Sequence, residues 1–225
     1  MDKKVNGEAQ RYGRSYISGL FGLRALATIA VVAYHLFSYR VEGGYLGVCL
    51  FFVLSGFLLA NKGTLELSRR VFSIREFYVK RLRRIYPSLL LFVLVTYAVL
   101  FLVEPGLLKN THGEFWSIVL GYHNWWQISR ENSYFSQFSA ISPFRHIWSL
   151  AMEIQFYLIY PFVFFLFLFL LKKFKKKTAL TIFASLVLLT AIPMIVAWLA
   201  GVGEARIYYG TDMRFYAILF GMTAG

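Results

Sequence analysis

The chain has 225 residues, of which 58% are hydrophobic, 19% aromatic and only 16% charged. A mean hydropathy of +0.58 and several apolar runs of about 20 residues exclude a soluble domain and are typical of a polytopic helical membrane protein. The net charge of +13 comes mainly from basic residues in short segments between these runs, which indicates cytoplasmic loops. We therefore expect no nucleic-acid partner.

The predicted fold is an all-α transmembrane helical bundle in one membrane domain, residues 1–225. A polar tail, residues 1–15, is expected to stay in the cytoplasm. The outer segment 107–146 is rich in Trp, Tyr, Ser and Asn, and part of it is predicted to lie amphipathically in the interface, at residues 115–126. Five spans are predicted, at residues 17–39, 45–60, 85–103, 147–171 and 178–200, with an outer loop at 201–211 and the start of a sixth span at Asp212.

Two basic segments set the predicted orientation. Residues 61–84 form the densest positive segment, and a run of lysines occupies residues 172–177. Both are expected in the cytoplasm, which agrees with a cytoplasmic amino terminus when the sides alternate along the chain. The sixth helix has only about fourteen residues, or about 21 Å, against a hydrocarbon thickness of about 30 Å, so we expect the chain to be truncated within it.

The first predicted span contains two polar side chains, Arg24 and His35. Eleven residues make three turns plus about 20°, so the two project from one face, roughly 16 Å apart along the axis. Such groups are costly in hydrocarbon unless they face a protein interior or a water-filled cavity, and they are functional candidates for that reason. The alternative for His35 is a packed or hydrogen-bonded core residue.

Arg81 and Arg84 are three residues apart at the cytoplasmic mouth of the third predicted span. On a helix they share a face, and guanidinium groups so placed suit bidentate recognition of a phosphate. We therefore predict a phosphorylated cytoplasmic ligand. The alternative is that these arginines only mark topology or contact lipid head groups.

Glu153 lies about one turn inside the fourth predicted span, with Ser149 and Tyr157 four residues to either side on its face. A buried carboxylate needs a partner, and the predicted orientation places Glu153 in the same outer half of the membrane as His35. A carboxylate beside an imidazole would orient it as a general base. The alternative is a structural pairing of Glu153 with Arg24 or a backbone amide.

Five motifs, in this order over about residues 16–225, resemble the acyltransferase 3 family. They are Gly22-Leu23-Arg24-Ala25-Leu26-Ala27 with His35, Gly47-Val48 through Phe51-Phe52-Val53-Leu54-Ser55-Gly56-Phe57, Phe77-Tyr78 with Arg81 and Arg84 before Ile85-Tyr86-Pro87, Trp148-Ser149-Leu150 with Glu153, and Tyr209-Gly210-Thr211-Asp212 with Arg214. Met213 replaces the threonine that the family usually has after Thr-Asp.

The resemblance implies an integral membrane O-acyltransferase. Members take an acyl group, usually acetyl, from cytoplasmic acyl-CoA and pass it to a hydroxyl of an extracytoplasmic carbohydrate such as peptidoglycan or a surface polysaccharide, and no metal is expected. The family's catalytic residues correspond to His35, Arg24 and Glu153, and its donor-binding pair corresponds to Arg81 and Arg84.

Members similar to peptidoglycan O-acetyltransferases are expected to relay acetyl through a tyrosine to a fused or separate extracytoplasmic esterase-like domain. The relay candidates here are Tyr134, Tyr208 and Tyr209, which could equally be interfacial belt tyrosines. Family members usually have more spans, so this chain is expected to be part of a longer protein or a truncated product. A transporter or proton-coupled channel that uses the intramembrane His, Arg and Glu is the alternative function, and a structural subunit would leave Arg24 and His35 unexplained.

Overall fold

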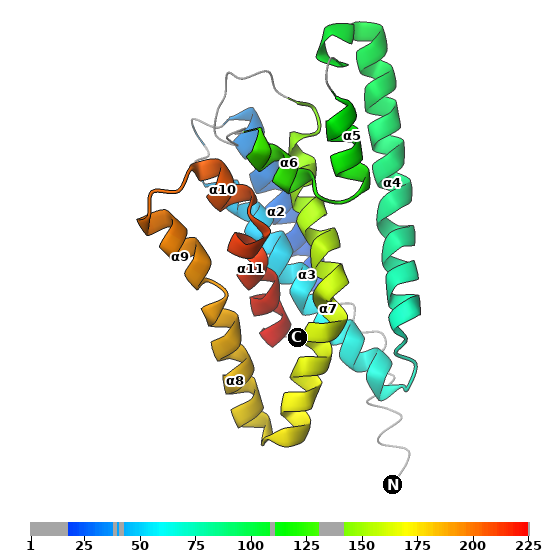
Figure 1. Cartoon of the computed structure of the whole chain (residues 1–225). Coiled ribbons are helices and arrows are strands. Elements are labelled where there is room, and N and C mark those ends of the chain that lie inside the picture. The colour runs from blue at the N-terminus through cyan, green and yellow to red at the C-terminus, as the bar shows by residue number, and fades with distance from the viewer. Residues whose placement is uncertain (1–17, 38–39, 41–42, 109–110, 131–141, 225) are drawn as a thin grey trace. The chain divides into compact units, whose positions relative to one another are not determined.

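The computed structural model of the chain describes residues 18–37, 40, 43–108, 111–130 and 142–224 (Figure 1). All regular structure in this described part is helical, which confirms the predicted all-α class. The helices are α2 (Ser18–Leu36), α3 (Leu46–Ser68), α4 (Ile74–Val103), η1 (Pro105–Leu108), α5 (His112–Val119), α6 (His123–Ser129), η2 (Arg145–Ile147), α7 (Trp148–Lys173), α8 (Lys176–Leu189), α9 (Ile192–Leu199), α10 (Glu204–Tyr209) and α11 (Thr211–Ala224).

Within the described ranges, five helical segments are long and apolar enough to cross a membrane, as the sequence predicts. They are Gly19–Leu36, Leu46–Ser68, Ile74–Val103, Arg145–Lys173 and Lys176–Leu199.

Two of these helices extend further than predicted, on either side of the basic connection. Helix α3 continues to Ser68, and α4 begins at Ile74 after Ser73, whose side chain accepts a hydrogen bond from the backbone N–H of Glu76. Pro87 therefore lies inside α4 and does not mark its first turn. The prediction placed the helix ends where the charges begin, but charge excludes a residue from hydrocarbon without breaking a helix.

Three predicted segments differ from the structure in how they divide into helices. The run 178–200 is two helices, because α8 ends at Leu189 with Thr190 as its C-cap, and α9 begins at Ile192 with a proline in its first turn. The predicted interfacial piece 115–126 is split between α5 and α6 at Gly121, which has a φ of 73°. The predicted outer loop 201–211 contains the short helix α10.

The chain forms two units, residues 1–54 and 55–225, which are described separately. In the first unit, α2 packs closely against the start of α3. A Cβ atom at Gly47 would lie 2.6 Å from the carbonyl oxygen of Ala27, so only glycine allows this approach. The rings of Tyr34 and Tyr45 meet edge to face at 5.7 Å. A small residue at this position lets the two helix backbones approach closely.

In the second unit, α7 packs against α4, α6, α8 and α11. Aromatic rings fill the space between α4 and α7, where Phe77 stacks on Tyr160 at 4.8 Å and Tyr160 stacks on Phe164 at 5.5 Å. The Tyr160 hydroxyl donates to the backbone carbonyl of Leu59 on α3, 2.8 Å away. These contacts hold three helices together around the basic end of α4.

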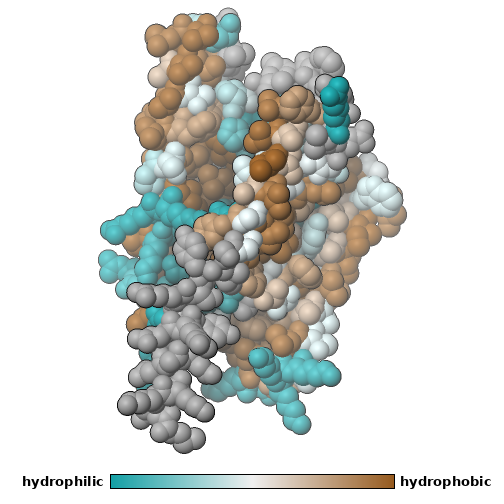
Figure 2. Space-filling model, turned by 180° about the vertical axis from the view of Figure 1, so that it is seen from behind, coloured by the Kyte–Doolittle hydropathy of each residue, from teal (hydrophilic) through white to brown (hydrophobic). Residues whose placement is uncertain are grey.

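The connections of this second unit separate into two ends (Figure 1). The α3–α4 and α7–α8 connections, which carry the basic segments, lie toward one end, and α5, α6 and α10 lie toward the other. Figure 2 shows apolar side chains along the helices and hydrophilic side chains gathered in separate groups. This arrangement agrees with the predicted grouping of the two basic segments, while the side of the membrane that they face stays a prediction.

Candidate active site

Glu153 is the polar centre of the site on α7. It is half-buried, and its Oε1 atom accepts hydrogen bonds from the Tyr157 hydroxyl and, at 3.0 Å, from the Ser55 hydroxyl of α3. The prediction that Glu153 and Tyr157 share a face is confirmed. Ser149 does not reach Glu153, because its hydroxyl instead donates to the carbonyl of His146 at 3.4 Å. Two neutral hydroxyl donors hold the carboxylate as an acceptor.

Arg81 of α4 meets this group from the other side. Its guanidinium carbon lies 5.0 Å from the ring centre of Tyr157 and 5.4 Å from that of Phe77. Such cation–π contacts contribute about 0.5–2 kcal/mol, depending on how far the cation is removed from water. A continuous set of contacts therefore joins Arg81, Tyr157 and Glu153.

A small pocket opens beside Arg81, between α3, α4 and α7. Three cations and one carboxylate lie along it together with apolar and aromatic side chains. Gly63 leaves space there, because a Cβ at that position would meet the Tyr160 hydroxyl and, at 3.0 Å, the ring of Phe164. The pocket is lined by Leu59, Lys62, Gly63, Glu66, Phe72, Phe77, Lys80, Arg81 and Tyr160.

The two predicted donor-binding arginines differ in their placement. Both lie on helix α4, as expected, but Arg81 is half-buried and lines the pocket, while Arg84 is exposed and does not line it. Lys62 and Lys80 line the pocket and were missed by the sequence reasoning, although both belong to the dense positive segment. Lys80 pairs with Glu66 at 3.6 Å and with Glu76 at 2.9 Å.

In the first unit, α2 runs unbroken through Arg24 and His35, as predicted. Nδ1 of His35 lies 2.7 Å from the carbonyl oxygen of Val31. Because a carbonyl oxygen only accepts, Nδ1 carries the proton in this bond and Nε2 of the neutral ring carries the lone pair. His35 is exposed and Arg24 half-buried. Their approach to Glu153, which belongs to the second unit, stays a prediction.

Two of the three relay candidates, Tyr208 and Tyr209, lie on α10, and the last motif continues into α11. Tyr208 and Tyr209 are buried, with ring centres 4.7 and 5.4 Å from that of Trp148. The Arg214 guanidinium lies over the Tyr208 ring at 4.8 Å, and its Nε donates to the Tyr208 carbonyl at 3.2 Å. The third candidate, Tyr134, lies outside the described residues.

Asp212 has a partner that sequence reasoning missed. Arg206 of α10 donates two hydrogen bonds to the Asp212 carboxylate, at 2.9 and 2.7 Å. This pairing lowers the pKa of Asp212 below its ordinary value. The Arg206 guanidinium also lies 5.1 Å from the ring centre of Trp125. Asp212 thus joins α10 to α11 and faces solvent, with no contact to Glu153.

A buried amide network supports Thr211 of the same motif. Asn124 of α6 donates to the Thr211 hydroxyl at 2.8 Å and to the Tyr209 carbonyl at 2.9 Å. Gln155 of α7 accepts from Thr211 at 2.6 Å and donates to the Asn124 amide oxygen at 2.8 Å. Each side chain is both donor and acceptor, so the network fixes α6, α7 and the start of α11 in register.

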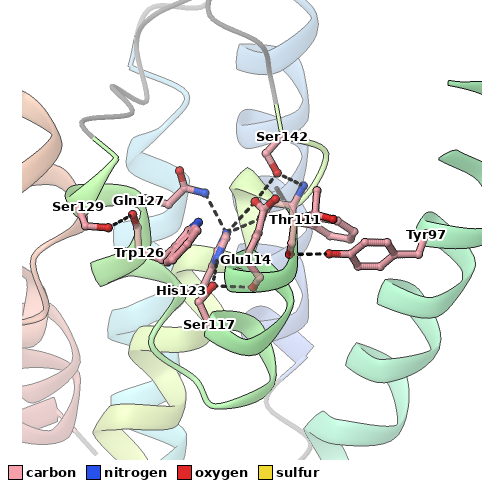
Figure 3. Close-up of polar contacts among 10 residues, drawn as sticks. Tyr97, Thr111, Glu114, Ser117, His123, Trp126, Gln127, Ser129 and Ser142 are labelled. Carbon is pink, nitrogen blue, oxygen red and sulfur yellow. Dashed lines mark hydrogen bonds and ion pairs between the residues drawn. The ribbon is translucent and has the colours of Figure 1, made fainter. Parts of the chain in front are cut away.

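A second polar cluster surrounds His123, between α5 and α6 (Figure 3). His123 is fully buried, and its Nδ1 lies 2.9 Å from the Ser117 hydroxyl and its Nε2 3.1 Å from the carbonyl of Phe144. Glu114, which accepts from Ser142, lies 3.9 Å from Nε2. Burial lowers the pKa of His123 to about 4 and raises the pKa of Glu114. The imidazole is therefore neutral near pH 7, and its contacts join α5, α6 and the backbone at Phe144.

The five membrane-length helices among the described residues are typical of a polytopic membrane protein. Within the described residues, no three metal-ligating side chains come together. The chain belongs to the acyltransferase 3 family, whose family model, described as an acyltransferase domain, matches residues 17–225. The resemblance that the five motifs carry is thereby confirmed.

Two curated relatives of this chain are named as O-acetyltransferases. The chain is 40% identical to a peptidoglycan O-acetyltransferase, OatA, of Listeria monocytogenes over 214 residues, which cover 94% of this chain and 34% of the relative. It is 36% identical to an O-acetyltransferase, OatA, of Staphylococcus aureus over 212 residues, which cover 93% of this chain and 34% of the relative. The chain thus spans about a third of the length of these relatives. No solved structure matches it.

Proposed function

We propose that this chain belongs to a membrane O-acyltransferase that transfers an acyl group, most often acetyl, from cytoplasmic acyl-CoA to a hydroxyl of an extracytoplasmic carbohydrate such as peptidoglycan. Family membership and the names of the relatives support the reaction class. The single observation that carries the donor assignment is the pocket lined by Arg81.

The chemistry of this pocket suits one end of an acyl-CoA. Lys62 and Lys80 both pair with Glu66, and Lys80 also pairs with Glu76, so Arg81 is the cation of the pocket that would attract a phosphate. Arg84, exposed on the same helix, would contact a second phosphate at the mouth. The donor would enter from the end of the second unit that carries the basic connections, so that end faces the cytoplasm in this proposal. A cytoplasmic amino terminus is proposed from the alternation of sides along the chain.

His35 is the proposed general base, with Arg24 on the path that leads to it. In the tautomer that the Val31 contact favours, Nε2 can take the proton of the acceptor hydroxyl. The acceptor oxygen then bonds to the acyl carbon, the carbon–sulfur bond breaks, and the CoA thiolate recovers the proton. Glu153 would orient the imidazole and stabilise its charged form.

The route to the acceptor is the remaining part of the proposal. A tyrosine relay through Tyr134, Tyr208 or Tyr209 would form an acyl-tyrosine ester before the carbohydrate is reached. The hydroxyls of Tyr208 and Tyr209 would have to become accessible for this, because both side chains are buried against Trp148. The greater length of the relatives leaves room for an additional extracytoplasmic domain that could receive the acyl group.

Binding of CoA to the purified protein tests the donor assignment. Arg81→Ala should weaken CoA binding about tenfold to a hundredfold, the usual effect of losing a hydrogen bond to a charged group, and Arg81→Lys should restore it only in part. Arg75→Ala removes an exposed cation of the same helix that does not line the pocket, and should leave binding unchanged.

Catalysis is tested separately through the base. His35→Ala should lower acetyl transfer about 10²–10⁴-fold at normal abundance in the membrane. A wild-type protein that binds no CoA and transfers no acetyl group would overturn the proposal and would favour a transporter.

A further inference from the structure

The two parts of the Tyr157 side chain contact two different members of the proposed site. Its hydroxyl donates to Oε1 of Glu153, one turn earlier on α7. Its ring carries the guanidinium of Arg81, at 5.0 Å, from α4. Tyr157 is only 5% exposed, so neither contact competes with bulk water. One buried side chain therefore joins the residue proposed to bind the donor with the residue proposed to orient the base.

The contact between the Tyr157 ring and Arg81 leaves the N–H donors of the Arg81 guanidinium for a ligand. A cation–π contact engages the charge of a guanidinium without using its N–H donors. Phe77 supports the same group from the same helix, at 5.4 Å. The two rings thus hold the guanidinium beside the pocket while its N–H groups remain the donors that a phosphate requires.

The contact with Glu153 is equally specific. Tyr157 and Ser55 both donate to Oε1, so Oε2 receives neither of these bonds. A carboxylate held through one oxygen by two hydroxyls has a fixed rotamer, and it presents its second oxygen in a defined direction. Arg81 contacts the ring and not the carboxylate, so the Glu153 charge is not consumed by an ion pair with Arg81.

We propose that Tyr157 is a positioning residue that fixes Glu153 through its hydroxyl and Arg81 through its ring. This inference rests on the proposed O-acyltransferase function. It has a consequence that simple packing would not have, because the two contacts belong to chemically separable parts of one side chain. Removing the hydroxyl should disturb the catalytic step alone, whereas removing the ring as well should also disturb donor binding.

Two substitutions separate these parts. Tyr157→Phe removes only the hydroxyl, and Tyr157→Leu removes the hydroxyl and the ring. Ser55→Ala acts on the same carboxylate oxygen from α3. The matched control is Tyr78→Phe, which deletes a hydroxyl that donates to the backbone carbonyl of Leu158 at 2.9 Å. The Tyr78 ring, which meets the pocket residue Phe77 edge to face at 5.5 Å, stays in this variant.

The experiment measures acetyl transfer from acetyl-CoA to a carbohydrate acceptor in membranes that contain equal amounts of each variant. Tyr157→Phe should lower kcat about tenfold or more and change the KM for acetyl-CoA by less than about twofold, because a hydrogen bond to a charged group is lost while the ring stays. Tyr157→Leu should lower kcat similarly and raise this KM several-fold. Ser55→Ala should lower kcat with KM unchanged, and Tyr78→Phe should match the wild type.

The experiment distinguishes a failure of the proposed function from a failure of the role proposed for Tyr157. A wild-type protein without acetyl transfer overturns the proposed function, whatever the variants do. An active wild type with an unchanged kcat in Tyr157→Phe overturns the role of Tyr157. If Tyr157→Phe does not accumulate in the membrane, Ser55→Ala decides, and an unchanged kcat in that variant likewise overturns the inference.

Discussion

Acid should weaken the packing of α5 against α6 through protonation of His123. Burial lowers the pKa of this imidazole to about 4 in the folded chain, against an ordinary value of 6.5. Above pH 6.5 the ring is neutral in both the folded and the unfolded states, so its titration does not change the free energy of unfolding there. As the pH falls from 6.5 to 4, only the unfolded state takes up the proton, and stability is lost progressively.

The size of this loss follows from the pKa difference. At 1.36 kcal/mol for each pKa unit, a fall from 6.5 to about 4 corresponds to about 3 kcal/mol. Glu114 opposes it, because burial raises its pKa and the folded state then takes up a proton before the unfolded state does. Acidification through the raised pKa of Glu114 therefore stabilises the fold and offsets part of the loss at His123.

Thermal unfolding midpoints in detergent between pH 7.5 and 4.5 would measure the contributions of His123 and Glu114. His123→Gln removes the titrating imidazole, so the midpoint should fall less on acidification than in the wild type. Glu114→Gln removes the opposing group, so its midpoint should fall more steeply. A wild-type profile that is indistinguishable from that of His123→Gln would refute the reasoning.

Two further predictions concern packing and sidedness. Gly56→Ala should lower the thermal midpoint by the equivalent of about 1–3 kcal/mol, because a Cβ there would meet the backbone carbonyl of Ile218 on α11; Gly19→Ala, which meets nothing within 4 Å, is the control, and equal midpoints would argue against this contact. Single cysteines would be introduced at Ser68, His112 and Thr178 in a Cys49→Ala background and probed with a membrane-impermeant thiol reagent on intact cells with a permeable wall. Only the cysteine at position 112 should react. Labelling at Ser68 would place the pocket on the side that lacks acyl-CoA.

Tyr157 and Glu153 show how far sequence could define the site. Their shared face follows from a spacing of four residues, because a helix fixes the direction of each side chain relative to its neighbours on the same helix. The partner on the next helix does not follow in this way. Ser55 is 98 residues from Glu153 in sequence, and their contact depends on the rotation and depth at which α3 packs against α7.

The basic segment, residues 61–84, likewise does not show from its sequence which of its residues meet in the fold. Its charges predict a cytoplasmic connection and a phosphate site, but a count of charges does not say which cations meet. Only the packing of α3, α4 and α7 brings Lys62, Lys80 and Arg81 to one pocket and leaves Arg84 outside it. Likewise, nothing in the spacing of Arg206 and Asp212 predicted their ion pair, because it depends on the turn between α10 and α11.

The sequence by itself determined the membrane class, the five spans and the family, because transfer of an apolar run into hydrocarbon is a sum over local residues and the motifs are local too. The tertiary structure alone decided which polar groups inside those spans pair with one another. Such pairs join helices that are distant in the chain, and their geometry depends on side-chain packing between helices, which no local pattern encodes.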